Sequence, residues 1–158
     1  MAIILGIDPG SNVTGFGVIE VVANKQLYIT SGRIKIVSSD FGSQLQQIFL
    51  GISEVVTNYR PEEVAIEQVF MHNNANSALK LGQARGAAIV AAGQGTANIF
   101  EYSARQVKQA VVGYGNAEKT QIQHMVKILL QIANRLQQDE ADALAIAICH
   151  ANFRRRFG

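Results

Sequence analysis

Four acidic residues stand at positions where their side chains could act together. Asp8 ends the apolar run AIILGID, and Glu67 ends a second apolar run, VAIE. Asp139 and Asp142 are three residues apart at the start of an alanine-rich segment, so a helix there projects both from one face of its first turn. Because open α/β sheets place their sites beyond the carboxyl ends of their strands, the four carboxylates are expected to converge there.

A group of carboxylates needs either bound cations or raised pKa values. Two unit charges about 4 Å apart repel by roughly 4 kcal/mol near a protein surface. Ligands that are all oxygen atoms favour Mg²⁺ over zinc, with Mn²⁺ able to substitute. Because two such ions can activate water and stabilise the leaving oxygen, the four acids predict phosphodiester hydrolysis with two Mg²⁺ ions per site.

Each acid also has a simpler interpretation when it is taken alone. The helix dipole favours acids such as Asp139 and Asp142 at a helix N-terminus. Glu67 can be an exposed acid at a strand end, and Asp8 can hydrogen-bond within the turn that contains Gly10. The combination of all four favours a shared site.

The elements that would position these acids alternate after an antiparallel start. The predicted strands cover residues 2–8, 14–22, 27–36, 64–69 and 97–101, from their β-branched and apolar runs. The predicted helices cover residues 45–59, 75–92, 118–132 and about 139–152. This order predicts an α/β fold with a mixed sheet, and the alanines at 141, 143, 145 and 147 would let the last helix approach it closely.

Composition limits the class of protein. A chain of 158 residues that is 48% hydrophobic fits a single domain over residues 1–158, with the tail after Ala151 expected to fray. The apolar runs are shorter than the roughly 18 residues of a membrane span, so no membrane association is expected. Cys149 is the one cysteine, which excludes an internal disulfide and a thiol zinc site and makes the cytoplasm the expected location.

Three motifs resemble those of the RuvC-type Holliday junction resolvases. The string Leu5-Gly6-Ile7-Asp8-Pro9-Gly10-Ser11, followed by residues 14–17 (TGFG), is similar to the first motif of that family. Residues 66–71 (IEQVFM) with 77–86 (SALKLGQARG) resemble its second block, and 139–148 (DEADALAIAI) resembles its final acidic helix. The resemblance runs from residue 2 to about 150. It implies an RNase H-like fold, in which a five-stranded mixed sheet (three antiparallel, then two parallel strands) has helices on both faces.

The resemblance also implies an activity. The family consists of crossover junction endodeoxyribonucleases, which cut four-way DNA junctions by paired, symmetric nicks that leave 5′-phosphate and 3′-hydroxyl ends during DNA recombination and repair. It implies that Asp8, Glu67, Asp139 and Asp142 are the catalytic metal ligands; the fourth is histidine in some relatives. It further implies a homodimer that works with the RuvA and RuvB branch-migration proteins.

Five further residues receive roles from the same resemblance. Phe70 would stack on a base near the crossover, and Lys108 and Lys119 would contact the cut strand, which fits base stacking and phosphate neutralisation in general. A core phenylalanine and solvated lysines are the alternatives. Gly82 and Gly86 each cost a helix roughly 1 kcal/mol relative to alanine, so a close neighbour is expected there, either a second subunit or the sheet.

Three other functions remain open. An ATP-binding protein of the actin and sugar-kinase clan has a similar first loop, but it needs two lobes and a much longer chain. An RNA-processing nuclease and a catalytically silent junction-binding module share the expected fold. The complete set of four acids argues against the silent module, and the IEQVF block with the DALA helix favours DNA over RNA.

Overall fold

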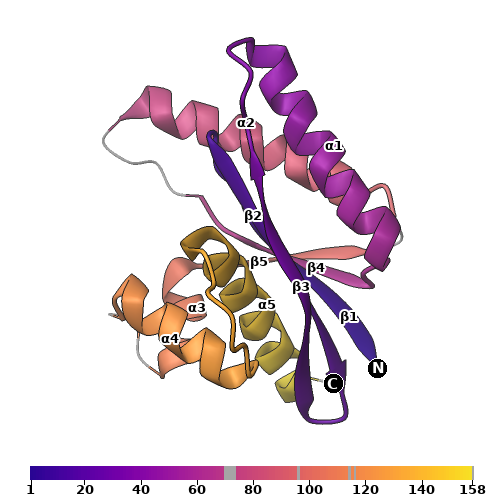
Figure 1. Ribbon diagram of the computed structural model, residues 1–158, viewed down its shortest axis with the longest axis vertical. Helices are drawn as coiled ribbons and strands as arrows, with labels where there is room; N and C mark the ends of the chain where they lie inside the picture. Colours follow the sequence, from indigo (N-terminus) through magenta and orange to yellow (C-terminus); the bar gives the residue numbers. More distant parts are fainter. Residues whose placement is uncertain (70–73, 96, 114, 116, 158) are drawn as a thin grey trace.

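A five-stranded sheet forms the centre of the molecule. The computed structural model describes residues 1–69, 74–95, 97–113, 115 and 117–157, with the backbone alone for residues 156 and 157. The strands lie in the order β3-β2-β1-β4-β5. Figure 1 shows helices on both faces of this sheet, with the two chain termini at the same end of the molecule.

The first three strands form an antiparallel meander. They are β1 (Ala2–Asp8), β2 (Val13–Val22) and β3 (Lys25–Lys35). β1 pairs with β2, β2 pairs with β3, and the second pairing has a register shift between Val18 and Ile19. The two remaining strands, β4 (Glu63–Glu67) and β5 (Asn98–Tyr102), run parallel to β1. The expected order of three antiparallel and two parallel strands is confirmed.

Two helices cover one face of the sheet and three cover the other. α1 (Phe41–Tyr59) and α2 (Ala75–Ala92) pack on the face that carries Leu5, Ile7 and Val18. α3 (Ala104–Val112), α4 (Lys119–Leu129) and α5 (Gln138–Phe157) belong to the opposite layer. None of the helices that the structure describes is long and apolar enough to cross a membrane.

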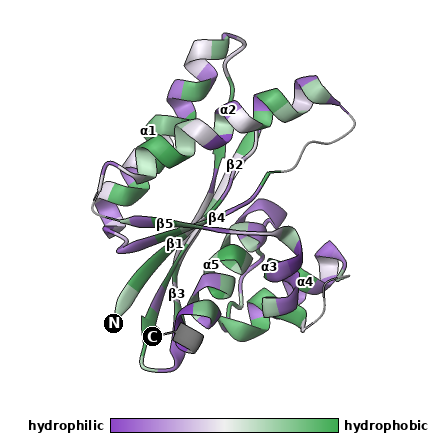
Figure 2. Ribbon diagram, turned by 180° about the vertical axis from the view of Figure 1, so that it is seen from behind, coloured by the Kyte–Doolittle hydropathy of each residue, from purple (hydrophilic) through white to green (hydrophobic). Residues whose placement is uncertain are grey.

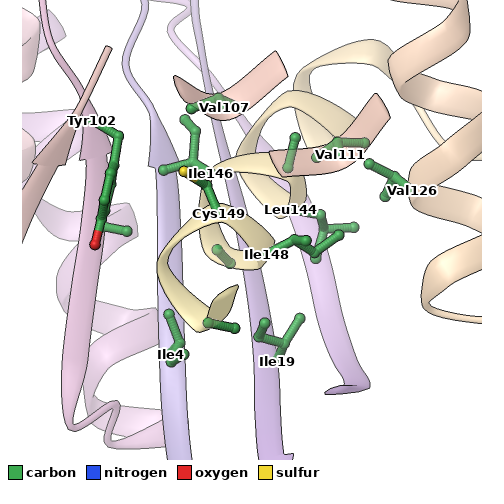
Figure 3. Packing of buried hydrophobic residues seen from close by; sticks show 14 of the residues in the cluster. Ile4, Ile19, Tyr102, Val107, Val111, Val126, Leu144, Ile146, Ile148 and Cys149 are labelled. Carbon is green, nitrogen blue, oxygen red and sulfur yellow. The ribbon is translucent and has the colours of Figure 1, made fainter. Parts of the chain in front are cut away.

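α5 is the helix that lies closest to the sheet. Its residues 144–149 are buried in one core cluster with Ile4 of β1 and Ile19 of β2 (Figure 3). Residues of α3 and α4 belong to the same cluster. Figure 2 shows hydrophobic stretches along both β1 and α5. The close approach requires glycine at position 6, because a Cβ there would lie 2.1 Å from the carbonyl oxygen of Ala143.

The structure differs from the sequence-based expectations at two helices. α3 was not predicted, although Ser103 and Gln106 form a capping box that begins it. α5 continues to Phe157, so the expected helix end near residue 152 is corrected, whereas the expected fraying of the tail after Ala151 stays a prediction. The extension is stabilised by tertiary contacts, since Arg154 pairs with Glu63 and the Asn152 side chain hydrogen-bonds Gln26 and the Ala110 carbonyl.

Candidate active site

The carboxyl ends of the central strands form a row of residues across the sheet. Ile7 pairs with Ile66 in the parallel β1–β4 ladder, which places Asp8 beside Glu67 at the next step. On the other side, Asp8 pairs with Gly15 of β2, and Gly15 pairs with Arg33 of β3. Paired residues point to the same face, so the row Glu67, Asp8, Gly15, Arg33 faces α5.

The first turn of α5 lies directly over this row. A Cβ at Gly15 would be 2.2 Å from the backbone oxygen of Asp139 and 3.1 Å from its Cβ. Asp139 therefore occupies the space that a side chain at position 15 would fill, with Asp8 on one side and Arg33 on the other. Asp142, one turn later, projects from the same face of the helix.

Burial and mutual repulsion raise the pKa of Asp8 to about 8. Burial is the largest cause, followed by the negative charges of Asp142, Glu67 and Asp139 in that order, while Lys119 acts in the opposite direction. The other three acids are thus near enough to influence the Asp8 carboxyl group. At neutral pH this side chain gains a charge only at a substantial free-energy cost, which a bound cation would offset.

Two more carboxyl groups of the site are affected in the same direction. Burial, and then the charge of Asp142, raises the pKa of Glu67. Burial also raises the pKa of Asp142, and the charge of Asp139 adds to it. Lys119 lowers both values, and Lys108 lowers that of Glu67. The two lysines thus act on the acids at this end of the sheet, and the Lys119 Nζ lies 4.0 Å from the Asp142 Oδ2.

The donor set fits a hard divalent cation by its chemistry. All four side chains offer carboxylate oxygens. Burial raises the pKa values of Asp8, Glu67 and Asp142, and so disfavours the ionised forms of these three unless a positive charge is supplied. Within the ranges that the structure describes, however, no three Asp, Glu, His or Cys side chains already stand at the spacing of a metal site.

Two contacts from β3 hold the first turn of α5. The Arg33 Nε lies 2.9 Å from the Asp139 Oδ2, and the Ser31 hydroxyl donates to the Glu140 carboxylate at 3.1 Å. Sequence reasoning did not identify either residue. The alternation of β3 indicates that residues 31 and 33 share a face, but the partner of that face follows only from strand register.

A third contact holds the end of β4. The Arg85 side chain reaches from α2, donates from Nε to the backbone oxygen of Glu67 at 3.2 Å, and pairs with Glu101 at 3.0 Å. It therefore restrains the backbone that carries Glu67. Arg85 lies inside the motif SALKLGQARG, but nothing in its spacing indicated this contact.

Phe70, Gly82 and Gly86 are the other residues to which the sequence assigned a role. Phe70 lies outside the described residues, so its expected stacking role stays a prediction. Gly82 and Gly86 have no described atom within 4 Å of where a Cβ would stand, so the described part of the chain supplies no close neighbour. Packing of the two glycines against the sheet, one of the two alternatives, is therefore excluded for the described residues.

Two hollows on the surface lie away from the acids. One of about 680 Å³ is lined by residues that include Tyr102, Cys149 and Phe153, and another of about 750 Å³ lies between the β2–β3 turn, α4 and α5. None of the four acids lines either hollow. The acids thus stand at an edge of the sheet, apart from both hollows.

Comparison with known proteins identifies the family. The family model described as crossover junction endodeoxyribonuclease RuvC matches residues 4–150. A relative of that name from Legionella pneumophila is 59% identical over 155 residues, which cover 98% of this chain and 89% of the relative. Another from Shewanella frigidimarina is 57% identical over 150 residues, which cover 95% and 87%.

Solved structures agree with these sequence matches. The RuvC of Thermus thermophilus in complex with a Holliday junction substrate superposes with a TM-score of 0.91 at 34% identity, covering 99% of this chain and 97% of that one. The yeast mitochondrial Holliday junction resolvase Ydc2 shares the fold, with a TM-score of 0.67 at 10% identity over 98% of this chain and 86% of its own. The chain therefore belongs to the RuvC family of crossover junction endodeoxyribonucleases.

Proposed function

We propose that this protein resolves four-way DNA junctions by Mg²⁺-dependent hydrolysis of phosphodiester bonds. The observation that carries the proposal is the group of electrostatically coupled carboxyl groups at the end of the central strands, in which the pKa of Asp8 is raised to about 8. The match of residues 4–150 to the family supports a junction as the substrate, as does the similarity to a relative solved with a Holliday junction.

The four carboxylates have a definite task in this proposal. Asp8 and Glu67 on rigid strands, with Asp139 and Asp142 on α5, would hold the divalent ions, and Mn²⁺ would substitute for Mg²⁺. When bound, a pair of such ions supplies Lewis acidity at the scissile phosphate and activates the attacking water. In-line attack by water leaves 5′-phosphate and 3′-hydroxyl ends and needs no covalent enzyme intermediate.

Basic residues beside the acids would bind the DNA backbone. Lys119, whose side chain is 70% exposed, and the half-buried Lys108 lower the pKa values of carboxyl groups in the site, which supports a role of both near the reacting phosphate. Their charges would neutralise phosphates and make junction binding depend on salt. The expected stacking of Phe70 on an unpaired base completes the proposed DNA contacts.

Two active sites are needed for paired, symmetric nicks, and α2 is the proposed dimer interface. Its surface exposes Leu79 and Val90, and no described atom of the same chain approaches Gly82 or Gly86. A second copy packed there would explain why glycine occupies both positions in spite of its cost to the helix. The proposed partners are the RuvA and RuvB proteins, and the proposed location is the cytoplasm.

The test is cleavage of a synthetic four-way junction, with linear duplex DNA and an RNA duplex of matched sequence as controls. The wild-type protein should nick the junction in two strands of like polarity when Mg²⁺ is present, and EDTA should abolish the reaction. Asp8→Asn should reduce cleavage by at least about 1,000-fold and leave junction binding within a few-fold of wild type. Equal cleavage of duplex and junction, or full activity of Asp8→Asn, would contradict the proposal.

A further inference from the structure

Arg33 is the cationic residue that contacts a proposed metal ligand from the sheet side. Its Nε lies 2.9 Å from the Asp139 Oδ2, and the two side chains are 28% and 32% exposed. Ion pairs with this much exposure contribute little to stability, because solvent screens the charges and two side chains must be ordered. The stability of the fold therefore does not account for the pairing of this arginine with this acid.

The position of Arg33 follows from the register of the sheet. Arg33 pairs with Gly15, and Gly15 pairs with Asp8, so arginine and aspartate flank a residue without a side chain. Asp139 enters that gap from α5. Its carboxylate thus lies between the Asp8 carboxyl group on β1 and the Arg33 guanidinium on β3.

A second contact from the same strand restrains the same helical turn. Ser31 lies two residues from Arg33 on the same face of β3 and donates to Glu140, which follows Asp139 in the chain. Glu140 in turn accepts from the backbone N–H of Gln137, immediately before α5 begins. The backbone of the turn is therefore held by Ser31 and Glu140, and the carboxylate of Asp139 is held by Arg33.

We infer that Arg33 is a positioning residue of the active site, which draws the Asp139 carboxylate toward β3 and so sets where this ligand stands before a divalent ion binds. The inference rests on the proposed function, because it assigns Asp139 to the metal site. Arg33 also offsets one negative charge of the four acids. It therefore weakens the attraction of the site for a cation while it fixes the geometry that catalysis requires.

Removal of the Arg33 charge should therefore raise the affinity of the site for a cation and lower the rate of cleavage, two changes that can be measured separately. Arg33→Gln removes the charge and keeps a side chain of similar reach. Mn²⁺ binding to the DNA-free protein should become about 3- to 10-fold tighter, because the site is more negative. Single-turnover cleavage of the junction at saturating Mg²⁺ should fall about 10- to 100-fold, because Asp139 is no longer held in place.

Matched variants separate positioning from charge and from damage to the fold. Arg33→Lys keeps the charge without the planar guanidinium, so it should restore the Mn²⁺ affinity of the wild type and recover only part of the rate. Lys35→Gln removes one positive charge from an exposed position of the same strand and should change neither quantity by more than about two-fold. The melting temperature in EDTA should stay within a few degrees for all three variants.

The outcomes separate this inference from the proposed function. If wild-type protein cleaves the junction and Arg33→Gln cleaves it equally well, the positioning role is wrong and the proposed function stands. Parallel losses of Mn²⁺ affinity and rate, as damage to the fold would produce, also overturn the positioning role. If wild-type protein neither binds Mn²⁺ nor cuts the junction, the proposed function fails, and the inference that rests on it fails too.

Discussion

The two ends of α5 carry polar groups of opposite character. At its N-terminal end, Asp139 and Asp142 join Asp8 and Glu67, and burial raises the pKa of three of these four carboxyl groups. Near its C-terminal end, His150 is 1% exposed and belongs to a chain of hydrogen bonds from β5 to β4. Both groups lie between the same helix and the same face of the sheet.

The polar groups near the C-terminal end of α5 satisfy one another's hydrogen bonds and charges. The His150 ring accepts from the Tyr102 hydroxyl at 2.5 Å through Nδ1 and donates to Glu63 at 2.6 Å through Nε2, a tautomer that agrees with the neighbouring groups. Burial lowers the pKa of His150, which keeps the ring neutral, and burial raises the pKa of Tyr102 to about 12, which keeps its hydroxyl a donor. Glu63 also pairs with Arg154 at 2.6 Å. Each named group has a partner within the chain.

The difference distinguishes a structural polar cluster from a functional one. Glu63 meets a hydrogen-bond donor and an arginine, so its charge is compensated by the fold. Asp8 lies near three other carboxyl groups. The ion pairs described at this end, Arg33 with Asp139 and Lys119 with Asp142, involve the two acids of α5, and the charges of Lys108 and Lys119 only partly offset the effect of burial on Asp8 and Glu67. Buried carboxyl groups that lack a compensating partner, beside a group that has one, fit the proposed binding of a cation from solution.

The largest expected effect is on the pH dependence of stability without metal. The pKa of Asp8 is about 8 in the folded protein and 3.8 as its ordinary value, so the folded state holds the proton more strongly. Its contribution to stability is therefore complete below pH 4 and is lost as the pH rises to 8. In EDTA at pH 8, Asp8→Asn should be more stable than wild type by as much as about 5 kcal/mol, and the gain should vanish near pH 4.

Urea unfolding of both proteins at pH 4, 6 and 8 measures this difference. Millimolar Mg²⁺ should stabilise wild type at pH 8 and leave Asp8→Asn almost unchanged. Subtracting the two proteins at each pH removes the opposite contribution of His150, whose lowered pKa makes stability fall as the pH drops below about 6.5. A gain that is the same at all three pH values would show that the acidic end is compensated after all.

The second prediction moves α5 away from the sheet. A Cβ at Gly6 would lie 2.1 Å from the Ala143 carbonyl oxygen and 3.0 Å from the Ala147 backbone nitrogen, and a helix backbone cannot yield locally. Gly6→Ala should cost about 3 kcal/mol of unfolding free energy and reduce cleavage at least 10-fold, because Asp139 and Asp142 move with the helix.

A glycine outside this contact provides the control. Gly42 lies in the first turn of α1, where a Cβ would meet only the Asp40 carboxylate at an ordinary 3.6 Å. Gly42→Ala should leave the stability within about 1 kcal/mol of wild type and the cleavage rate unchanged. Comparable losses from both variants would mean that the contact between Gly6 and α5 does not position the acids.

The order of the strands and the positions of the acids at their ends could be predicted from the sequence. Apolar runs that end in a single acid mark both the strand and its edge, and the predicted helix over residues 75–92 coincides with α2. α3 was not predicted because it is only nine residues long and buries only Val107 and Val111, too few for a clear helical pattern of apolar residues. Its capping box, Ser103 with Gln106, was the available signal.

Contacts between residues on different strands of the sheet could not be predicted in this way. The pairing of Gly15 with Arg33 depends on the β2–β3 turn and on the irregularity between Val18 and Ile19, neither of which a pattern of alternation determines. The partners of His150 depend likewise on how α5 is placed over β4. The types of the proposed catalytic residues can be predicted from the sequence, whereas the residues that hold them in place depend on strand register.

The third prediction concerns the removal of Glu63, which pairs with His150 and Arg154 near the C-terminal end of α5. Glu63→Ala leaves the buried His150 Nε2 without its acceptor and Arg154 without its partner, so it should cost about 2 to 3 kcal/mol of unfolding free energy. Mn²⁺ affinity should stay within about two-fold of wild type, since the change lies at the other end of β4. Thermal unfolding and Mn²⁺ titration measure the two effects.

The neighbouring acid serves as the control for this variant. Glu62 is exposed, and Glu62→Ala removes the same charge from the chain. It should change stability by no more than about 0.5 kcal/mol. If Glu63→Ala weakened Mn²⁺ binding strongly, the two ends of α5 would be one coupled unit instead of two independent groups.

The smallest expected effect concerns Lys119, which partly compensates the acidic end. Its charge lowers the pKa values of Asp8, Glu67 and Asp142, so Lys119→Met should raise them and move the rising limb of the pH–rate profile to higher pH. The shift should be below about one pH unit, because the side chain is 70% exposed and solvent screens its charge. The salt dependence of junction binding should also decrease by about one phosphate contact. Lys127→Met, at the other end of α4, should leave the pH–rate profile in place, and a shift to lower pH in Lys119→Met would mean that this lysine does not act on the acids through its charge.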